Sequence, residues 1–125
     1  MPRPVLDEAA IHPAVRAKVA GWQHAIVEEV RAAAQANDVL VVGMAFNPFP
    51  ARARRALDAI GQPYRYLEYG SYLSNWQPRN ALKMWSGWPT FPMVFVKGIL
   101  VGCYTDLKAL IDSGELRKTL ATTTI

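Results

Sequence analysis

The sequence predicts an α/β domain, in which strands alternate with helices around one core. Two observations carry this prediction. The apolar run Val39 to Val42 precedes a Pro-containing turn and a helix, and a later Thr-Phe-Pro turn leads into a second apolar run, Met93 to Val96. Continuous apolar runs of this length are typical of strands that are buried on both faces. A chain of 125 residues, 51% of them hydrophobic, is long enough for one such core.

Composition excludes several classes of function. The net charge of +4 would need a supporting nucleic-acid motif, which the sequence lacks, so we predict no nucleic-acid partner. No apolar run approaches the roughly 18 residues of a membrane span, and charges and prolines near Met1 argue against a signal peptide. The single cysteine, Cys103, excludes an intrachain disulfide and a cysteine-rich metal site. By elimination, we expect a cytoplasmic protein.

Residues 1–37 are interpreted as an N-terminal arm followed by a long helix. Pro13 suits the first helical position, and an apolar stripe at helical spacing predicts a helix over 13–36, about 36 Å long. The stripe consists of Val15, Val19, Trp22, Ile26 and Val30. Our interpretation is that this helix covers one face of the sheet. Because it is longer than a small sheet needs, the alternative is that part of it packs on a second subunit, so the chain is either a monomer or a homodimer through this helix.

The remaining elements follow in order between turn signals. Strands are predicted over 39–42, 64–68, 93–96 and 99–101, and helices over 51–60, 77–85 and 105–112, with a short final helix from about residue 113. Gly61 and Gly87 end helices, Lys97-Gly98 joins a hairpin, and Thr105-Asp106 is expected to cap the helix over 105–112. Residues 69–75 read as a loop and 121–125 as a tail, which leaves 38–120 as the main domain.

Three segments carry a resemblance to a known family. Trp88-Pro89-Thr90-Phe91-Pro92 is followed by a glycine turn and helix from Gly102, and then by Ser-Gly-Glu-Leu at 113–116. From about residue 39 to 120 the chain resembles a glutaredoxin of the monothiol branch. The resemblance implies a thioredoxin-like fold with a four-stranded mixed sheet flanked by helices, here with an extra N-terminal helix. It also implies a cis peptide bond before Pro92.

The departures from the family pattern bear on function. Where glutaredoxins carry Cys-Gly-Phe-Ser or Cys-Pro-Tyr-Cys, this chain has Asn47-Pro48-Phe49-Pro50, so Asn47 replaces the nucleophilic cysteine. An amide forms neither the attacking thiolate nor the thiolate ligand of an iron–sulfur cluster. We therefore predict no catalytic residue and no cluster. Asn is among the best N-caps, and we interpret Asn47 as one. The alternative is that its amide donates to the sulfur of a bound thiol.

Glutathione binding is what the resemblance leaves open. The backbone of Phe91 would pair with the cysteinyl unit of glutathione, Arg79 would meet the glycine carboxylate, and Thr105 with Asp106 would lie at the γ-glutamyl end. The full set of candidate contacts is Phe49, Arg79, Thr90, Phe91, Pro92, Gly102, Thr105 and Asp106. Met44 stands where relatives carry a lysine, and Cys103 replaces the second glycine of a pair. We therefore expect any binding of glutathione to be weak.

The remaining reactive or charged residues are interpreted as structural or solvent-exposed. Cys103 is read as a small apolar residue, with a relocated nucleophile as the alternative. Arg52, Arg54 and Arg55 are read as a solvated helix face, and a docking site for an anion or an acidic partner is the alternative. His12 and His24 lack neighbouring ligands at metal spacing, so we predict no metal site.

The sequence thus supports a glutaredoxin-like protein that binds a small thiol, a thiol peptide or a protein partner without redox chemistry. A different class is a transferase-like enzyme that uses bound glutathione as the nucleophile. A residual role in iron–sulfur or redox homeostasis is the least favoured alternative.

Overall fold

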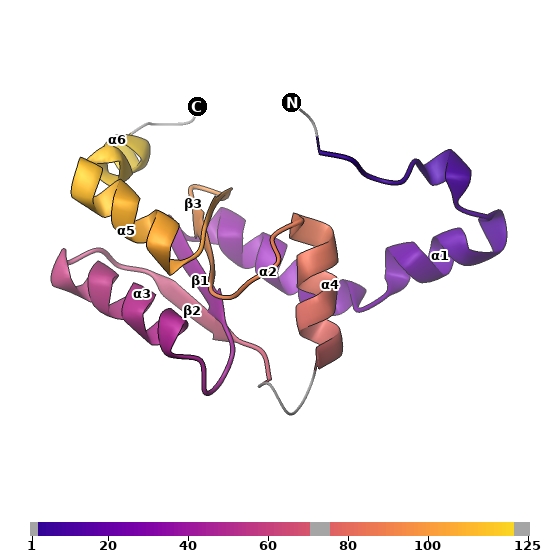
Figure 1. Ribbon diagram of the computed structural model, residues 1–125, viewed down its shortest axis with the longest axis horizontal. Helices are drawn as coiled ribbons and strands as arrows, with labels where there is room; N and C mark the ends of the chain where they lie inside the picture. Colours follow the sequence, from indigo (N-terminus) through magenta and orange to yellow (C-terminus); the bar gives the residue numbers. More distant parts are fainter. Residues whose placement is uncertain (1–2, 71–75, 122–125) are drawn as a thin grey trace.

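The helices and strands follow the predicted α/β order. The structure is a computed structural model that describes residues 3–70 and 76–121 (Figure 1). The helices are η1 (Glu8–Ala10), α1 (Pro13–Gly21), α2 (His24–Ala36), α3 (Pro48–Ala59), α4 (Trp76–Ser86), α5 (Tyr104–Ser113) and α6 (Glu115–Ala121), and the strands are β1 (Val39–Gly43), β2 (Arg65–Glu68), β3 (Met93–Val96) and β4 (Ile99–Gly102). The predicted loop over 69–75 and the tail over 121–125 lie largely outside the described residues, at 71–75 and 122–125.

The four strands form one mixed sheet in the order β2-β1-β3-β4. β1 pairs with β2 in parallel, whereas the β1–β3 and β3–β4 pairs are antiparallel. In the centre, Val41 lies opposite Tyr66 on one side and Val94 on the other. The predicted four-stranded mixed sheet with flanking helices is therefore confirmed, and so is the burial of the 39–42 strand on both faces.

The strand β1 divides the core into two layers because its side chains alternate between the faces of the sheet. Leu40 and Val42 face the layer beneath α2 and α4, and Val39 and Val41 face the layer beneath α3, α5 and α6. Figure 1 shows these helices on the two sides of the sheet. The first layer also contains Val30, Leu82, Phe91 and Met93, and the second contains Ala53, Leu57, Leu107 and Leu116.

The single long helix predicted over 13–36 is wrong. The chain turns at Trp22-Gln23, where Gln23 adopts the left-handed conformation (φ 52°) as the N-cap of α2. Glycine is a poor helix former, and Gly21 ends α1 at this point. The 13 residues of α2 span about 20 Å, which already matches the roughly 17 Å of a five-residue strand. The sheet face therefore needs no longer helix.

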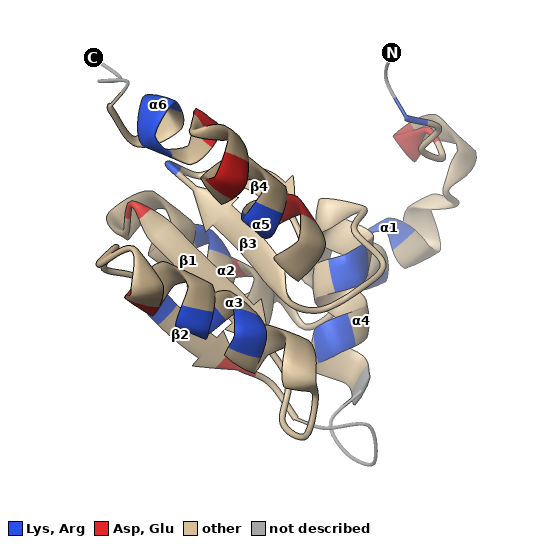
Figure 2. Ribbon diagram, turned by 60° about the vertical axis from the view of Figure 1, so that its left-hand side comes forward, with Lys and Arg blue, Asp and Glu red and all other residues tan. Residues whose placement is uncertain are grey.

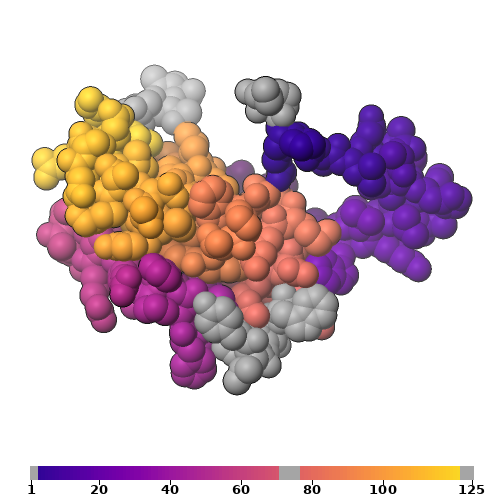
Figure 3. All heavy atoms as spheres, in the orientation of Figure 1, coloured from indigo at the N-terminus to yellow at the C-terminus, as the bar shows by residue number. Residues whose placement is uncertain are grey.

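The N-terminal segment stands out from the body of the protein. α1 has no buried residue, and Val15 and Val19 are 41% and 46% exposed. Figure 3 shows residues 3 to about 21, in indigo and violet, as a lobe beside the rest of the molecule. The apolar stripe predicted over this region therefore packs on the core only from Ile26 onward.

Two local turns agree with the predictions. Lys97 and Gly98 both have positive φ values (52° and 79°) and close the hairpin between β3 and β4. Lys97 also makes a 3.0 Å ion pair with Asp38, at the start of the neighbouring strand. The peptide bond between Phe91 and Pro92 is cis, as the resemblance implied. Within the described residues no helix is long and apolar enough to cross a membrane.

Candidate functional site

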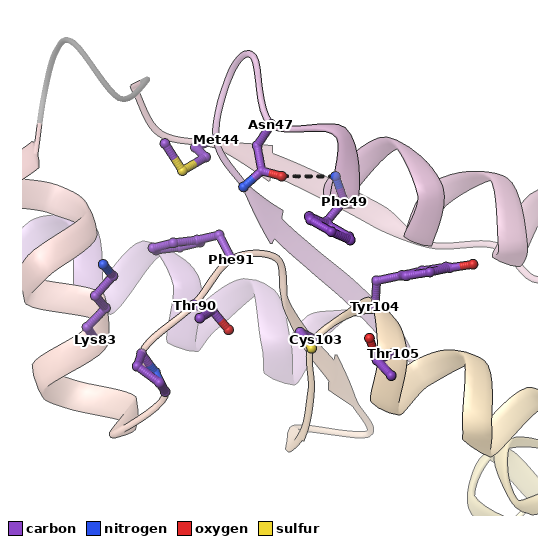
Figure 4. A pocket seen from close by; sticks show the side chains of 10 residues that line it. Met44, Asn47, Phe49, Lys83, Thr90, Phe91, Cys103, Tyr104 and Thr105 are labelled. Carbon is purple, nitrogen blue, oxygen red and sulfur yellow. Dashed lines mark hydrogen bonds between the residues drawn. The ribbon is translucent and has the colours of Figure 1, made fainter.

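A cavity of about 390 Å³ opens where α3, α4 and α5 meet the turn before β3. Figure 4 shows Lys83 from α4 on one side, Thr105 from α5 on the other, and Phe91 between them. The wall is mostly apolar, and none of the described residues that line it is acidic. Its residues are Met44, Asn47, Phe49, Lys83, Pro89, Thr90, Phe91, Cys103, Tyr104 and Thr105.

Asn47 forms the edge of the cavity as the N-cap of α3. Its backbone is extended, and its Oδ1 accepts a 2.9 Å hydrogen bond from the backbone N–H of Phe49. Pro48 follows at the first helical position, where its fixed φ suits a helix and its missing N–H is no loss. The interpretation of Asn47 as an N-cap is confirmed. The helix therefore begins at Pro48, three residues before the predicted start at Ala51.

The loop before Asn47 presents an aromatic side chain to solvent. Phe46 is 92% exposed and has a φ of 61°, a left-handed conformation that is strained for a residue with a Cβ atom. Hydrogen bonds hold the start of this loop. The N–H of Ala45 donates to the carbonyl of Gly70 at 2.8 Å, and the N–H of Tyr69 donates to the carbonyl of Gly43 at 3.0 Å.

The floor of the cavity is the turn that enters β3. Phe91 is 6% exposed and belongs to the core layer beneath α2 and α4, so the packing of that layer fixes its position. The Nζ atom of Lys83 lies 5.9 Å from the centroid of the Phe91 ring. A cation over an aromatic face in a partly buried site is favourable, and its charge faces the same cavity.

The N-terminus of α5 forms the far wall, and here the predicted cap is wrong. The helix begins at Tyr104 with Cys103 as the N-cap, not at Thr105-Asp106. Asp106 is the third residue of the helix, and its Oδ2 accepts hydrogen bonds from the Cys103 backbone N–H (3.0 Å) and the Cys103 Sγ (3.3 Å). A carboxylate at this position satisfies an otherwise unpaired N–H at the helix start. The helix starts before Thr105 because the carboxylate of Asp106 accepts the hydrogen bond of the Cys103 N–H.

Gly102 makes this arrangement possible. Its φ is 114°, and a Cβ atom added there would lie 2.3 Å from Oδ2 of Asp106. Only glycine fits at this point. The carboxylate of Asp106 therefore stabilises the protein's own helix start and does not line the cavity.

Two cations of α4 differ in their relation to the cavity. Arg79 is only 7% exposed, and its Nη1 donates to the carbonyl of Tyr69 at 3.4 Å. Lys83, four residues later on the same helix, lines the cavity instead. Sequence reasoning missed Lys83, although its i, i+4 spacing from Arg79 places both on one helix face. Pro89 and Tyr104 also line the cavity and were not among the predicted contacts, although both lie inside segments that carry the family resemblance.

The structure brings together about half of the predicted contact residues. Phe49, Thr90, Phe91 and Thr105 line the cavity with Asn47, whereas Arg79, Pro92, Gly102 and Asp106 lie outside its wall. The glutathione contacts assigned to all eight stay predictions. Pro50 turns away from the cavity and packs against Gly43 of β1. Across the described part of the chain, no group of three or more His, Cys, Asp or Glu side chains is arranged to hold a metal ion.

Comparison with known proteins agrees with this geometry. The family model described as Glutaredoxin matches residues 39–101. A glutaredoxin-like protein from Dictyostelium discoideum is 42% identical over 91 residues, which cover 73% of this chain and 74% of that protein. A probable monothiol glutaredoxin of Legionella pneumophila is 36% identical over 72 residues, covering 58% and 78% of the two chains.

Solved structures show the same fold. Oxidized glutaredoxin 2 from Chlamydomonas reinhardtii superposes with a TM-score of 0.67 at 26% identity, covering 78% of this chain and 92% of that one. A buckwheat glutaredoxin–glutathione complex gives a TM-score of 0.70 at 20% identity over 79% and 90% of the chains, a likeness of fold alone. Taken with the match over residues 39–101, these relatives show that the chain belongs to the glutaredoxin family.

Proposed function

We propose that this chain is a redox-inactive member of the glutaredoxin family that binds glutathione, a related thiol peptide or a segment of a partner protein in the cavity beside Asn47. One observation carries the proposal. The side chain at the start of α3 is an amide, and its oxygen is engaged in capping the helix. The position at which the resemblance places the reactive sulfur therefore has a structural role here.

The proposed loss of redox chemistry follows because the side-chain amide of Asn47 cannot form a thiolate. Thiol–disulfide exchange needs a thiolate, which a helix N-terminus stabilises through its N–H groups and dipole. Asn47 provides no sulfur, and the first-turn N–H of Phe49 is already bonded to it. Cys103, the one sulfhydryl, sits on the opposite wall with the Asp106 carboxylate 3.3 Å away. Cysteines become reactive at helix N-termini or beside cations; Cys103 is the N-cap of α5, but the Asp106 carboxylate beside it disfavours a thiolate.

The cavity nevertheless retains the properties of a ligand site. It is concave and largely apolar, with a few polar groups at its edges, as small-molecule sites are. Lys83 supplies a cation at one end, and Thr105 in the first turn of α5 supplies a hydroxyl at the other end. An elongated ligand with an anionic group at one end and polar groups at the other, such as glutathione, matches this arrangement.

Two assays test the proposal together. Titration with glutathione, followed by tryptophan fluorescence, should give a saturable change because Trp88 packs against the core layer that holds Phe91. A glutathione–disulfide reductase assay should show no turnover above background. Turnover that disappears in Cys103→Ser would overturn the proposal and identify Cys103 as the nucleophile. Asn47→Cys should create activity in an otherwise intact scaffold, which controls for the quality of the protein.

A transferase-like enzyme is the second candidate, and one observation favours it. The amide of Asn47 lies in the wall of the cavity (Figure 4), within the same site as any bound thiol. If this amide donates to the sulfur of bound glutathione, it stabilises the thiolate form of the ligand. The pKa of bound glutathione, read from thiolate absorbance at 240 nm, should then fall below that of free glutathione. An unshifted titration curve would rule the enzyme out.

A further inference from the structure

Exposed aromatic side chains lie in the segment that leads from β1 into α3, next to the cavity residue Asn47. Phe46 is 92% exposed and Phe49 is 43% exposed, and both come from the junction of β1 and α3 beside Asn47. Phe49 also lies 6.5 Å from Tyr104 of α5, measured between ring centroids, so the aromatic surface crosses the mouth of the cavity. Clustered aromatic side chains around a hollow are typical of a protein interaction site.

The backbone at Phe46 adds a separate reason to assign a function to this segment. A phenylalanine with a φ of 61° is strained, and its ring gains almost no burial in return. Strained conformations of this kind persist where the surrounding structure enforces them, and they gather at ligand-binding segments. The strained backbone leaves the ring exposed to solvent, and none of the described residues buries it.

Among the described residues, the charged side chains that line the cavity or stack on its aromatic rim are cations. The guanidinium of Arg52 lies 5.1 Å from the centroid of the Phe49 ring, and Lys83 lies across the cavity on α4. Arg55 is exposed one turn further along α3. Figure 2 shows blue cationic positions along α3 and α4 on this face. No acidic side chain lies among the wall residues that the structure describes, and the nearby carboxylate of Asp106 is engaged by Cys103.

We propose that this rim, defined by Phe46, Phe49, Arg52 and Lys83, docks an acidic segment of a partner protein that places an apolar side chain in the cavity. Charge complementarity selects an acidic partner, and the exposed aromatic rings select an apolar anchor within it. The inference rests on the proposed function in one respect only, namely that the cavity is a binding site. It extends that site beyond a tripeptide, because Phe46 lies outside the cavity wall.

The experiment uses the full chain and a fluorescein-labelled peptide in which Leu-Phe is flanked on both sides by Glu residues. Fluorescence anisotropy should show saturable binding that weakens as salt shortens the Debye length from about 10 Å at 0.1 M. A peptide with Lys in place of every Glu should bind at least about tenfold more weakly, since like charges then face each other. A single-stranded oligonucleotide of matched charge serves as the competitor.

Variants locate the binding surface. Arg52→Glu combined with Lys83→Glu should reduce affinity for the acidic peptide at least about tenfold, and Phe46→Ala about fivefold, as expected for an aromatic anchor. Arg117→Glu on α6, exposed and remote from the rim, makes the same change of charge per site and should alter affinity less than about twofold. The elution volume and circular dichroism of each variant establish that it is folded.

Three results would overturn the inference. They are equal binding of the basic peptide, an equal loss in Arg117→Glu, and displacement of the peptide by the oligonucleotide at equimolar concentration. Its failure is separable from that of the proposed function. Turnover in the reductase assay would leave peptide docking intact, and glutathione binding without peptide binding would confine the site to the cavity.

Discussion

Asn47 and Phe49 are joined by a 2.9 Å hydrogen bond, in which the backbone N–H of Phe49 donates to the side-chain oxygen of Asn47. The bond occupies the helix start that the resemblance assigns to a cysteine. A thiolate there would be held by the same N–H groups. The scaffold has thus kept the geometry of an anion-stabilising helix start while an uncharged amide fills it.

Replacing Asn47 should separate the capping role from the ligand role. Asn47→Ala removes the acceptor for the Phe49 N–H and should lower the free energy of unfolding by about 1 kcal/mol. Asn47→Asp keeps an acceptor and places a negative charge at the positive end of α3, so its stability should equal or exceed that of the parent. Urea denaturation measures both. Equal stability of the Ala variant and the parent would contradict the capping assignment.

Two glycine substitutions should have opposite signs. Gly102→Ala places a Cβ atom 2.3 Å from Oδ2 of Asp106 at a φ of 114°, so it should destabilise the protein by at least about 1–2 kcal/mol. Gly21→Ala meets nothing within 4 Å and lies in helix α1, so it should be neutral or stabilising by about 0.5–1 kcal/mol. Thermal unfolding of the pair distinguishes a need for glycine from a general effect of adding a methyl group.

The sequence predicted those parts of the fold that depend on local pattern. The apolar run of β1, the Lys97-Gly98 hairpin and the cap at Asn47 each follow from residues within one short segment. The break at Gln23 was missed because the apolar stripe continues through it in sequence, and this pattern outweighed the local signal of Gly21. The limited length of the sheet face also sets how much helix packs on it. The cis peptide bond between Phe91 and Pro92 was predicted from the family resemblance. The sequence alone would favour a trans bond, because most X-Pro bonds in folded proteins are trans.

The site was predictable only where the family pattern and the local pattern agree. Phe91 and Thr105, which were predicted as glutathione contacts, both line the cavity, and the contacts themselves stay predictions. Asp106 was expected to contact the γ-glutamyl end of glutathione. Its carboxylate instead accepts a hydrogen bond from the backbone N–H of Cys103, in a position that is open because residue 102 is glycine. Arg79 was expected to meet the glycine carboxylate of glutathione. Its burial and its hydrogen bond to the carbonyl of Tyr69 depend on tertiary packing, which the local sequence does not show.

Substitution of the two cations on α4 should therefore give different results. Lys83→Met should weaken glutathione binding at least about tenfold with little change in stability, since a charge-assisted contact is worth about 1.5–3 kcal/mol. Arg79→Met should instead lower the free energy of unfolding, because it removes a buried donor to the carbonyl of Tyr69. Calorimetric titration and urea denaturation of both variants give the comparison. Reversed results would return the carboxylate contact to Arg79.

Phe46→Gly tests whether the exposed ring is held under strain. Glycine adopts a φ of 61° without a steric penalty, and a ring that is 92% exposed contributes little burial, so stability should stay constant or rise by about 0.5–1 kcal/mol. Phe91→Gly, at a buried position in the core, is the matched control and should destabilise the protein by at least about 3 kcal/mol. Loss of stability in Phe46→Gly comparable to that control would mean that the ring packs on the protein.

Tyr66 and Tyr69 should determine how the protein responds to alkaline pH. Burial raises the pKa of both phenols above the ordinary value, with hydrogen bonds to Glu68 and Glu29, respectively, as the next cause. An unfolded chain releases these protons near pH 10, whereas the folded chain retains them. Above pH 10 the unfolded state therefore binds fewer protons than the native state, and the free energy of unfolding falls as pH rises.

Replacement of both phenols should remove that part of the pH dependence. The double variant Tyr66→Phe, Tyr69→Phe should lose the late phase of the tyrosinate absorbance at 295 nm, and its stability should fall less steeply between pH 10 and 12 than that of the parent. Tyr64→Phe, one register position before β2, provides a control that keeps both hydrogen-bonded phenols. An identical slope in the double variant and the parent would show that other groups cause the alkaline loss. Because Tyr69 joins the end of β2 to Glu29 of α2, a shallower slope would also identify this contact as one that holds the helix to the sheet.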